Sequence, residues 1–432
     1  MTVTLVLLAL FAVLLTGLDI GFALAGLGIA MLVLGDYSLL MVPQTLMASM
    51  DNFLLLSVPL FILMSNVLLK GGVGEDLFAA VQSWIGHWPG GLAVASIVSC
   101  ALFGAISGSS VATAATIGTV AIPAMLARGY EPRLVYGTLA AGGTLGIIIP
   151  PSIPMIVYGY VTAESIVDLF LAGIGPGILL SALFAAFVSL RTRFAPGYRP
   201  VARAGWGERR AATRRALPSL ALALAIVGGI YAGVFTPTEA AAVGFVAALI
   251  ITLGPQRRLR LAQLPAIAFE SMQTSVMVMF IIAGAKLFGQ AITLYQIPQE
   301  VTALVVGHLT GAGAFVFAIC ALLLVMGFVL ETLSMMLLML PISHPSLAGF
   351  GIDAIWFGVL FTMMIECALI TPPVGLNLFV IQAVAGQSTA GATRVGLSEV
   401  AQGSAPFVVL ILIVIGLLWM LPEIALFIPF QL

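Results

Sequence analysis

Long apolar segments alternate with short polar ones along nearly the whole 432-residue chain. Ten of these segments are long enough for membrane-spanning helices, because about 20 apolar residues cross the hydrocarbon core of a bilayer. Helices are expected there because backbone groups inside a bilayer must pair with one another. The predicted spans are residues 1–16, 18–34, 53–69, 133–160, 166–190, 218–234, 238–254, 266–290, 353–385 and 403–430.

Two further apolar stretches, residues 91–127 and 312–349, are interrupted by small and polar residues. The first contains GAISGSSVATAA at 104–115, and the second contains GFVLETLS at 327–334. Irregular backbone at membrane depth is tolerated only where protein or a wet cavity surrounds it. We therefore predict that each stretch is a re-entrant helical hairpin, which enters and leaves the membrane on one side.

The composition supports a membrane location for the whole chain. Hydrophobic residues make up 61% and charged residues 8%, whereas soluble domains contain about 25% charged residues. The N-terminal apolar stretch has no basic region before it, so we expect a retained span and not a cleaved signal peptide. The three cysteines lie in apolar runs and are expected to be packing residues. The three histidines show no metal-ligand spacing.

The basic residues give the expected orientation. Eight arginines lie in the polar segment 191–217, and short loops rich in Lys and Arg stay in the cytoplasm. If both hairpins enter and leave on one side, seven more basic residues join them there. These are Lys70, Arg128, Arg133, Arg257, Arg258, Arg260 and Arg394. Of the 16 basic residues only Lys286 is left over, and both termini are expected in the periplasm.

The two halves of the chain match at an offset of about 220 residues. Asp19 and Glu239 each lie in the first turn of a span, where the helix dipole favours an acid. The hairpins correspond to each other, and IIIPPSIP at 147–154 corresponds to LITPPVGL at 369–376. Each half makes an odd number of crossings, so the second half is expected to be inverted.

We therefore predict three parts of the chain. Residues 1–200 are the first repeat half, whose hairpin at 91–127 opens toward the cytoplasm, and residues 201–217 are an arginine-rich cytoplasmic linker. Residues 218–432 are the second half, whose hairpin at 312–349 opens toward the periplasm. Inverted repeats with interrupted segments in matching positions indicate a secondary transporter. A gene duplication without a transport function is the alternative.

The turn of the first hairpin has the chemistry of an ion site. Ser107, Gly108, Ser109, Ser110 and Thr113 combine hydroxyl oxygens with a flexible backbone. The hydroxyls can bind loose backbone groups or coordinate a hard cation. The helix after the turn begins near Ser110, and its free N–H groups can bind an anion.

Each half also contains a proline pair, Pro150–Pro151 and Pro372–Pro373, a similar distance after its hairpin. Proline lacks an N–H group, so carbonyls one turn earlier lose their helical partners. Such carbonyls, next to serine and threonine oxygens, can replace the hydration shell of Na⁺. The alternative is a simple kink in each membrane helix.

Four ionisable residues at depth have open roles. Glu331, in the turn of the second hairpin, is expected either to cap the next half-helix, to bind a cation or to carry a proton. Glu270 and Glu366 are the other candidate proton carriers. Lys286 either snorkels to the interface or supplies a fixed positive charge. An anionic substrate would otherwise depend on half-helix N-termini and bound cations.

Other classes of protein fit less well. The chain has no phosphate-binding loop of the form GxxxxGK[ST] and no recognisable catalytic set, so we do not expect an enzyme or an ATP-driven pump. A channel needs a polar stripe along several spans, and a membrane scaffold has little use for two matched polar hairpins. A stand-alone cation-coupled carrier remains the nearest alternative.

Five stretches carry a family resemblance that covers nearly the whole chain. They are SVPLFILMSNVLLKGG at 57–72, GAISGSSVATAATIGTVAIPAM at 104–125, GTLGIIIPPSIPMIVYG at 143–159, GVFTPTEAAAVG at 233–244 and TPPVGLNLFV at 371–380. In this order they resemble the large membrane subunit of tripartite ATP-independent periplasmic (TRAP) transporters, within the ion transporter superfamily.

The resemblance implies an all-α multi-pass protein of the bacterial inner membrane that imports an organic acid, typically a carboxylate. It implies sodium as the coupling ion, with no other cofactor and no nucleic acid. It also implies two partners besides the lipid bilayer, a small four-helix membrane subunit and a soluble periplasmic binding protein. We expect both partners to be separate polypeptides. An elevator motion of the hairpins and broken helices against the remaining spans is implied too.

The resemblance also implies two sodium sites, one in each half. The first would lie between Ser107–Thr113 and Gly143–Pro151, and the second between Gly327–Ser334 and Thr371–Asn377. The implied substrate and ion residues are Ser107, Gly108, Ser109, Ser110, Thr113, Gly143, Thr144, Gly146, Pro150, Pro151, Ser152, Gly327, Glu331, Thr332, Ser334, Thr371, Pro372, Pro373, Gly375 and Asn377. Sodium itself would be bound at Ser107, Ser110, Thr113, Gly143, Gly146, Gly327, Thr332, Thr371 and Gly375. The second hairpin lacks the double serine of the first, so the two sites need not coordinate alike.

Overall fold

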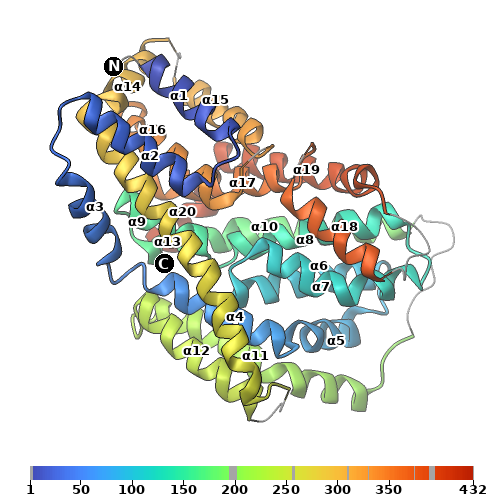
Figure 1. Cartoon of the computed structure of the whole chain (residues 1–432). Helices are drawn as coiled ribbons and strands as arrows, with labels where there is room; N and C mark the ends of the chain where they lie inside the picture. The colour runs from blue at the N-terminus through green and yellow to red at the C-terminus, as the bar shows by residue number, and fades with distance from the viewer. Residues whose placement is uncertain are drawn as a thin grey trace.

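The computed structural model describes residues 3–193, 202–254, 258–308, 311–328, 330–373, 375–388 and 395–431, and this part consists of helices joined by turns and loops, without strands (Figure 1). The helices of the first half are α1 (Val3–Leu15), α2 (Ile20–Leu34), α3 (Met41–Met50), α4 (Ser57–Lys70), α5 (Val73–Ile85), α6 (Gly91–Ser107), α7 (Ser110–Leu126), α8 (Pro132–Ile148), α9 (Ile153–Thr162) and α10 (Ile166–Arg193). Those of the second half are α11 (Trp206–Tyr231), α12 (Pro237–Leu253), the short 3₁₀ helix η1 (Leu261–Gln263), α13 (Leu264–Leu294), α14 (Ile297–His308), α15 (Ala312–Met326), α16 (Thr332–Phe350), α17 (Ala354–Leu369), α18 (Leu376–Ser388), α19 (Leu397–Met420) and α20 (Glu423–Gln431). The predicted boundary at residues 200 and 201, together with Arg199, Arg257 and Arg394, lies outside the described residues.

Both predicted hairpins turn back on themselves. In the first hairpin, α6 and α7, the backbone N–H of Leu92 donates to the hydroxyl of Tyr130 over 3.2 Å, so its two ends meet. In the second, α15 and α16, the rings of Phe315 and Phe350 stack with centroids 4.9 Å apart. The prediction of two helical hairpins is therefore confirmed.

The two proline pairs break their helices as expected. The predicted span 133–160 is two helices, α8 and α9, which are bent by 40°. The predicted span 353–385 is likewise divided into α17 and α18. Both Pro150–Pro151 and Pro372–Pro373 have cis peptide bonds. Two unwound segments thus lie in matching places of the two halves.

The structure contains helices that the hydropathy pattern did not predict. α3, α5 and α14 are each too short to cross a bilayer. α11 begins at Trp206, so most of the predicted linker 201–217 is helical. Its first turns are held against α5, where the Arg209 guanidinium lies 5.2 Å from the ring centroid of Trp84. The charged residues of this segment had hidden its helical pattern.

Fewer helices reach full spanning length than the ten predicted spans suggest. Among the described residues, α10, α11, α13 with η1, α16 and α19 are long and apolar enough to cross a membrane. The bent pairs α4–α5 and α8–α9 bring the total to seven. Helices such as α2 and α12 have 15 and 17 residues and are therefore only about 22–26 Å long. The remaining predicted spans are helices of this shorter kind.

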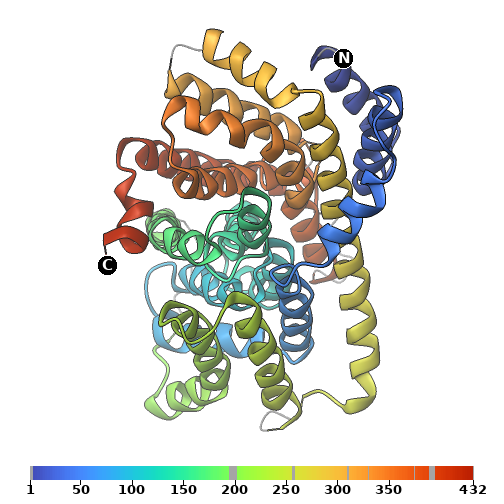
Figure 2. The same ribbon diagram turned by 90° about the vertical axis from the view of Figure 1, so that its left-hand side faces the viewer.

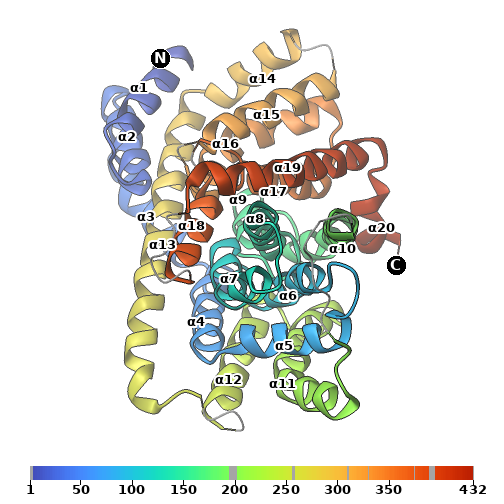
Figure 3. The ribbon, with the colours of Figure 1, turned by 90° about the vertical axis from the view of Figure 1, so that its right-hand side faces the viewer.

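The halves exchange contacts in a reciprocal way. α2 packs along α13, and α12 packs along α4; at the offset of about 220 residues, α2 corresponds to α12 and α4 to α13. The first hairpin packs on α18 of the second half, and the second hairpin packs on α9 of the first half. Both turned views show α13 as a long helix along one side of the molecule, with α2 beside its upper half (Figures 2 and 3). The two hairpins and their broken helices lie beside α13.

Candidate functional site

A cavity of about 390 Å³ lies where the tips of both hairpins face α4 and α13. It lies toward the end of the molecule where Lys70 pairs with Glu270 at 3.1 Å. We call it the inner cavity, because the basic residues predict that this end faces the cytoplasm. Its polar wall residues are Ser65, Asn66, Ser107, Ser109, Ser110, Glu270, Thr274, Glu331 and Thr332. Its volume suits a small organic molecule, since ligand pockets are typically about 300–1,000 Å³.

The tip of the first hairpin is a compact cluster of hydroxyl and carbonyl oxygens. Gly108 ends α6 with a φ of 61°, a left-handed conformation that glycine adopts at little cost. Ser109 begins α7 by accepting a hydrogen bond from the N–H of Ala112 at its Oγ, 3.3 Å away. The Oγ1 of Thr113 lies 3.0 Å from the Oγ of Ser107 and donates to the Ser109 carbonyl over 2.7 Å. Four predicted residues thus share one turn.

The glycines of α8 bring that helix against this tip. A methyl group added at Gly146 would lie 2.7 Å from Oγ1 of Thr113 and 2.9 Å from the carbonyl oxygen of Ser109. One added at Gly143 would lie 3.0 Å from the carbonyl oxygen of Ser110. Only residues without a side chain permit this approach. The structure therefore brings Gly143 and Gly146 to the hairpin as the sequence predicts.

The unwound segment after α8 completes this side of the site. A methyl group at Gly108 would lie 2.8 Å from the carbonyl oxygen of Pro151, so the tip and the proline pair are in contact. Ser152 accepts a hydrogen bond at its Oγ from the N–H of Met155 and begins α9. Thr144 is buried and donates its hydroxyl to the carbonyl of Ala141, so it acts within α8.

Asn377 lies at the first hairpin, although the sequence grouped it with the second. Its side-chain amide donates hydrogen bonds to the hydroxyl of Ser110 and to the carbonyl of Ala140, the latter over 3.3 Å. Its side-chain oxygen is buried and has no hydrogen-bond partner among the described residues. Asn377 reaches the first hairpin because α18 packs on α7, a contact between halves that sequence spacing does not reveal.

The tip of the second hairpin is organised by an acid. Glu331 accepts hydrogen bonds from the N–H of Ser334 over 2.8 Å and from the N–H of Leu333 over 3.1 Å. It also accepts one from the hydroxyl of Ser334 over 2.6 Å. Of the roles left open, helix capping is therefore the one that the described contacts show. Thr332 is buried beside it and faces the inner cavity.

The segment around the second proline pair resembles the first only in part. Gly327 lies against Ala368 of α17, as Gly108 does against the first proline pair. The hydroxyl of Thr371 donates to the carbonyl of Cys367 over 2.6 Å. Gly375, with a φ of 54°, lies beside the carbonyl oxygens of Leu369 and Thr371. Carbonyls gather here, with fewer hydroxyl oxygens than at the first tip.

The oxygen donors at both tips suit a hard cation. Within the described ranges, no group of three or more His, Cys, Asp or Glu residues could hold a metal ion. Carbonyl and hydroxyl oxygens are the donors that these tips offer, and hard cations prefer oxygen ligands. Such a set suits Na⁺ better than a transition metal, which favours nitrogen and sulfur donors.

Residues of α4 and α13 in the cavity wall were missed by the sequence analysis. Ser65 and Asn66 of α4 line the cavity opposite the hairpin tips, as does Thr274 of α13. The Asn66 amide donates to the hydroxyl of Ser271 over 2.8 Å and so fixes α4 against α13. The sequence did contain a signal for them, because Ser65 and Asn66 are adjacent polar residues within an apolar predicted span.

The remaining ionisable candidates lie in different places. Glu270 forms a largely exposed ion pair with Lys70 at one mouth of the inner cavity. Glu366 is fully buried in α17 beside the backbone of Ile148, and neither of its oxygens has a described hydrogen-bond partner of ordinary geometry. Lys286 lies outside the inner cavity, near the other end of α13.

Apolar helices, paired broken helices and two hairpin tips that face one polar cavity define the class of integral membrane secondary transporters. A family model described as "Tripartite ATP-independent periplasmic transporter, DctM component" matches residues 7–424. This chain belongs to that family, and it is a membrane transport protein and not an enzyme. The resemblance stated from sequence motifs is thereby confirmed.

Two relatives and one solved structure show the range of similarity. A C4-dicarboxylate TRAP transporter large permease protein of Pseudomonas aeruginosa is 37% identical over 88% of this chain and 87% of its own length. An ectoine TRAP transporter large permease protein of Halomonas elongata is 33% identical over 89% of this chain and 88% of its own length. The YdaH transporter of Alcanivorax borkumensis shares the fold with a TM-score of 0.62 and 14% identity, over 90% of this chain and 88% of that one.

Proposed function

We propose that this chain is the membrane subunit that moves an organic acid into the cell in symport with sodium ions. The observation that carries the proposal is the convergence of both hairpin tips on one polar cavity. The tips offer carbonyl and hydroxyl oxygens for cations and a half-helix N-terminus at Ser110 for an anion. A bound cation beside that N-terminus would add the positive charge that a carboxylate needs.

The first tip supports a sodium site most strongly. Carbonyl oxygens of Ser109, Ser110 and Pro151 lie close to the glycines that pack there. The side-chain oxygen of Asn377 is buried and unpartnered in the same place. A buried polar atom without a partner costs free energy, and a cation bound there would supply the partner. We propose a second site at the carbonyls of Leu369 and Thr371, near Gly375.

We also propose that the acid is handed over by a soluble periplasmic binding protein and that a small four-helix membrane subunit works beside this chain. Similarity to large permease proteins of TRAP transporters supports both partners. The inner cavity lies between the hairpins on one side and α4 and α13 on the other. This location supports an elevator motion in which the hairpins and broken helices slide along α13.

Reconstitution with both proposed partner proteins tests the proposal. Succinate, ectoine and isethionate are suitable probes, because relatives are named for C4-dicarboxylate, ectoine and isethionate transport. We expect uptake of one such solute only when sodium is present outside and the binding protein is added. Ser110→Ala and Thr371→Ala should each weaken the sodium dependence. Equal uptake with potassium in place of sodium would refute the coupling, and uptake without the binding protein would indicate a stand-alone carrier.

A further inference from the structure

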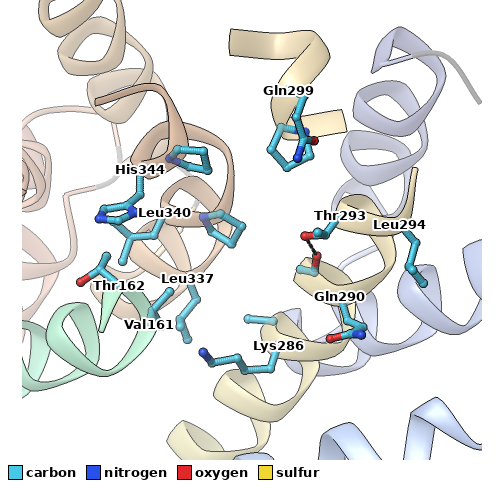
Figure 4. Close-up of a pocket in the computed structure, with 15 residues that line it drawn as sticks. Val161, Thr162, Lys286, Gln290, Thr293, Leu294, Gln299, Leu337, Leu340 and His344 are labelled. Atoms are coloured by element: carbon cyan, nitrogen blue, oxygen red, sulfur yellow. Dashed lines mark hydrogen bonds between the residues drawn. The ribbon is translucent and has the colours of Figure 1, made fainter. Parts of the chain in front are cut away.

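A second polar cavity, of about 400 Å³, lies at the other end of the same helical interface. We call it the outer cavity. It is formed by the end of α9, the last turns of α13, the start of α14 and the body of α16 (Figure 4). Its polar wall residues are Thr162, Lys286, Gln290, Thr293, Gln299 and His344.

The two cavities are related through α13 and α16. The first half of α13, from Glu270 to Ile281, lines the inner cavity, and the second half, from Ala285 to Leu294, lines the outer cavity. The beginning of α16 lines the inner cavity, and its middle lines the outer one. At 1.5 Å per residue, Thr274 and Lys286 are about 18 Å apart along the helix. A solute that crosses between hairpins and α13 would therefore meet both cavities.

The repeat relates the cavities as well. At an offset of about 220 residues, Asn66 in the wall of the inner cavity corresponds to Lys286 in the wall of the outer one. The neighbouring wall residues Ser65 and Leu69 correspond in the same way to Ala285 and Gly289. The same face of the same repeat helix thus lines a cavity in each half. The second half differs by placing a cation on that face.

Lys286 has no acidic partner in the described part of the chain. No described carboxylate lies within 4.0 Å of its Nζ, and the cavity wall contains no Asp or Glu. Its Nζ lies 4.6 Å from the ring centroid of Tyr160, a cation–π contact that leaves the charge uncompensated. Figure 4 shows the side chain extended from α13 toward Val161 and Leu337 on the opposite wall.

Other polar groups of the wall could help Lys286 to bind an anion. Gln290 and Gln299 carry amide donors, and His344 faces Glu164, with Nε2 and Oε1 3.9 Å apart. Glu164 lies within 4.0 Å of the histidine and, among the described residues, forms no ion pair with Lys286. A half-buried ammonium without a described counter-ion, in a cavity whose wall also carries amide donors, is suited to bind a carboxylate.

We propose that the outer cavity is a second binding site, where Lys286 holds the carboxylate of the transported acid before it reaches the hairpin tips. The proposal rests on the proposed import of an organic anion. The proposal adds a binding site in the outer cavity, which the packing of α13 on α16 separates from the inner cavity.

Charge-selective labelling of the cavity tests this site without requiring transport. Gln290→Cys places a thiol in the wall, and Ser38→Cys places one on an exposed loop outside it. Right-side-out vesicles that contain the complex are treated with anionic sulfonatoethyl or cationic trimethylammonioethyl methanethiosulfonate. With Lys286 present, we expect the anionic reagent to be favoured at residue 290, and Lys286→Met to lower the anion-to-cation rate ratio about 10-fold.

Two controls make the result specific. Lys286→Arg should keep the ratio, and Ser38→Cys should show the same ratio with and without Lys286. Acetate, the smallest carboxylate probe, should slow the anionic reagent at residue 290 more than chloride does, and only when residue 286 is positive. An unchanged ratio in Lys286→Met, or acetate that protects no better than chloride, overturns the proposal. Because labelling needs no ion gradient, this result is independent of whether sodium drives uptake.

Discussion

The side-chain amide of Asn377, in α18, donates a hydrogen bond to the hydroxyl of Ser110 at the start of α7. Both residues are buried, and 267 positions separate them in the chain. The bond joins the first hairpin to the broken helix of the opposite half. The first sodium site that we propose therefore draws on residues of both halves of the repeat.

Asn377→Ala should destabilise the first hairpin and weaken sodium-dependent uptake. Loss of a buried hydrogen-bond partner costs about 1–3 kcal/mol. Because the two side chains share one bond, Ser110→Ala combined with Asn377→Ala should cost less than the sum of the single changes, by about 0.6–1.7 kcal/mol. Unfolding free energies of the four proteins provide the measurement. Strict additivity would show that the bond does not couple the halves.

Gly146→Ala should impair the proposed first sodium site while the protein still inserts. The added methyl group would lie 2.7 Å from Oγ1 of Thr113, so the tip must move away from α8. We expect at least a several-fold rise in the sodium concentration that gives half-maximal uptake. Gly416→Ala, in α19, is the matched control, since nothing lies within 4 Å of its added methyl group. A normal sodium response in Gly146→Ala would remove the tip from the coupling mechanism.

Glu331→Gln and Glu331→Ala should differ, because the described role of this residue is to cap α16. Glutamine retains a side-chain oxygen that can accept from the N–H of Ser334, whereas alanine does not. We expect Glu331→Ala to cost about 0.5–2 kcal/mol, the range for a lost N-cap. Glu331→Gln should keep most of the stability and most of the uptake. A stable Glu331→Gln protein without uptake would instead indicate that the negative charge itself is needed.

The sequence predicted those features that depend on local chemistry. The proline pairs remove backbone donors, the glycines permit tight turns and close approach, and the double serine supplies hydroxyl groups at a turn, so both hairpins and both breaks could be located. The packing of α18 on α7 is a contact between distant segments, and no local pattern indicates it. For this reason the contact of Asn377 with the first tip was not predicted, and Asn66 was not among the predicted site residues. The start of α11 was not predicted as a helix because its charged residues interrupt the apolar pattern. It packs on α5 through the contact of Trp206 with Trp84, which are far apart in the sequence.

Glu366→Leu should make the protein more stable and less active. The carboxyl is fully buried and lacks a described hydrogen bond of ordinary geometry, so it lowers stability. Replacing such a group by an apolar side chain of similar size should gain about 1–3 kcal/mol. A residue that costs stability is expected to serve function, and Glu366 lies beside Ile148, at the end of α8 where the first break begins. We therefore expect uptake to fall at least several-fold in Glu366→Leu.

The matched control for this change is Met364→Leu, a volume-conserving change at a buried position of the same helix. It should alter stability by less than about 1.5 kcal/mol and leave uptake unchanged. Thermal unfolding in detergent and initial uptake rates in proteoliposomes measure the two effects. Glu366→Gln separates charge from shape, because it keeps the polar side chain but cannot exchange a proton. If Glu366→Leu lowers stability and preserves uptake, the carboxyl is a packing element and not part of the coupling mechanism.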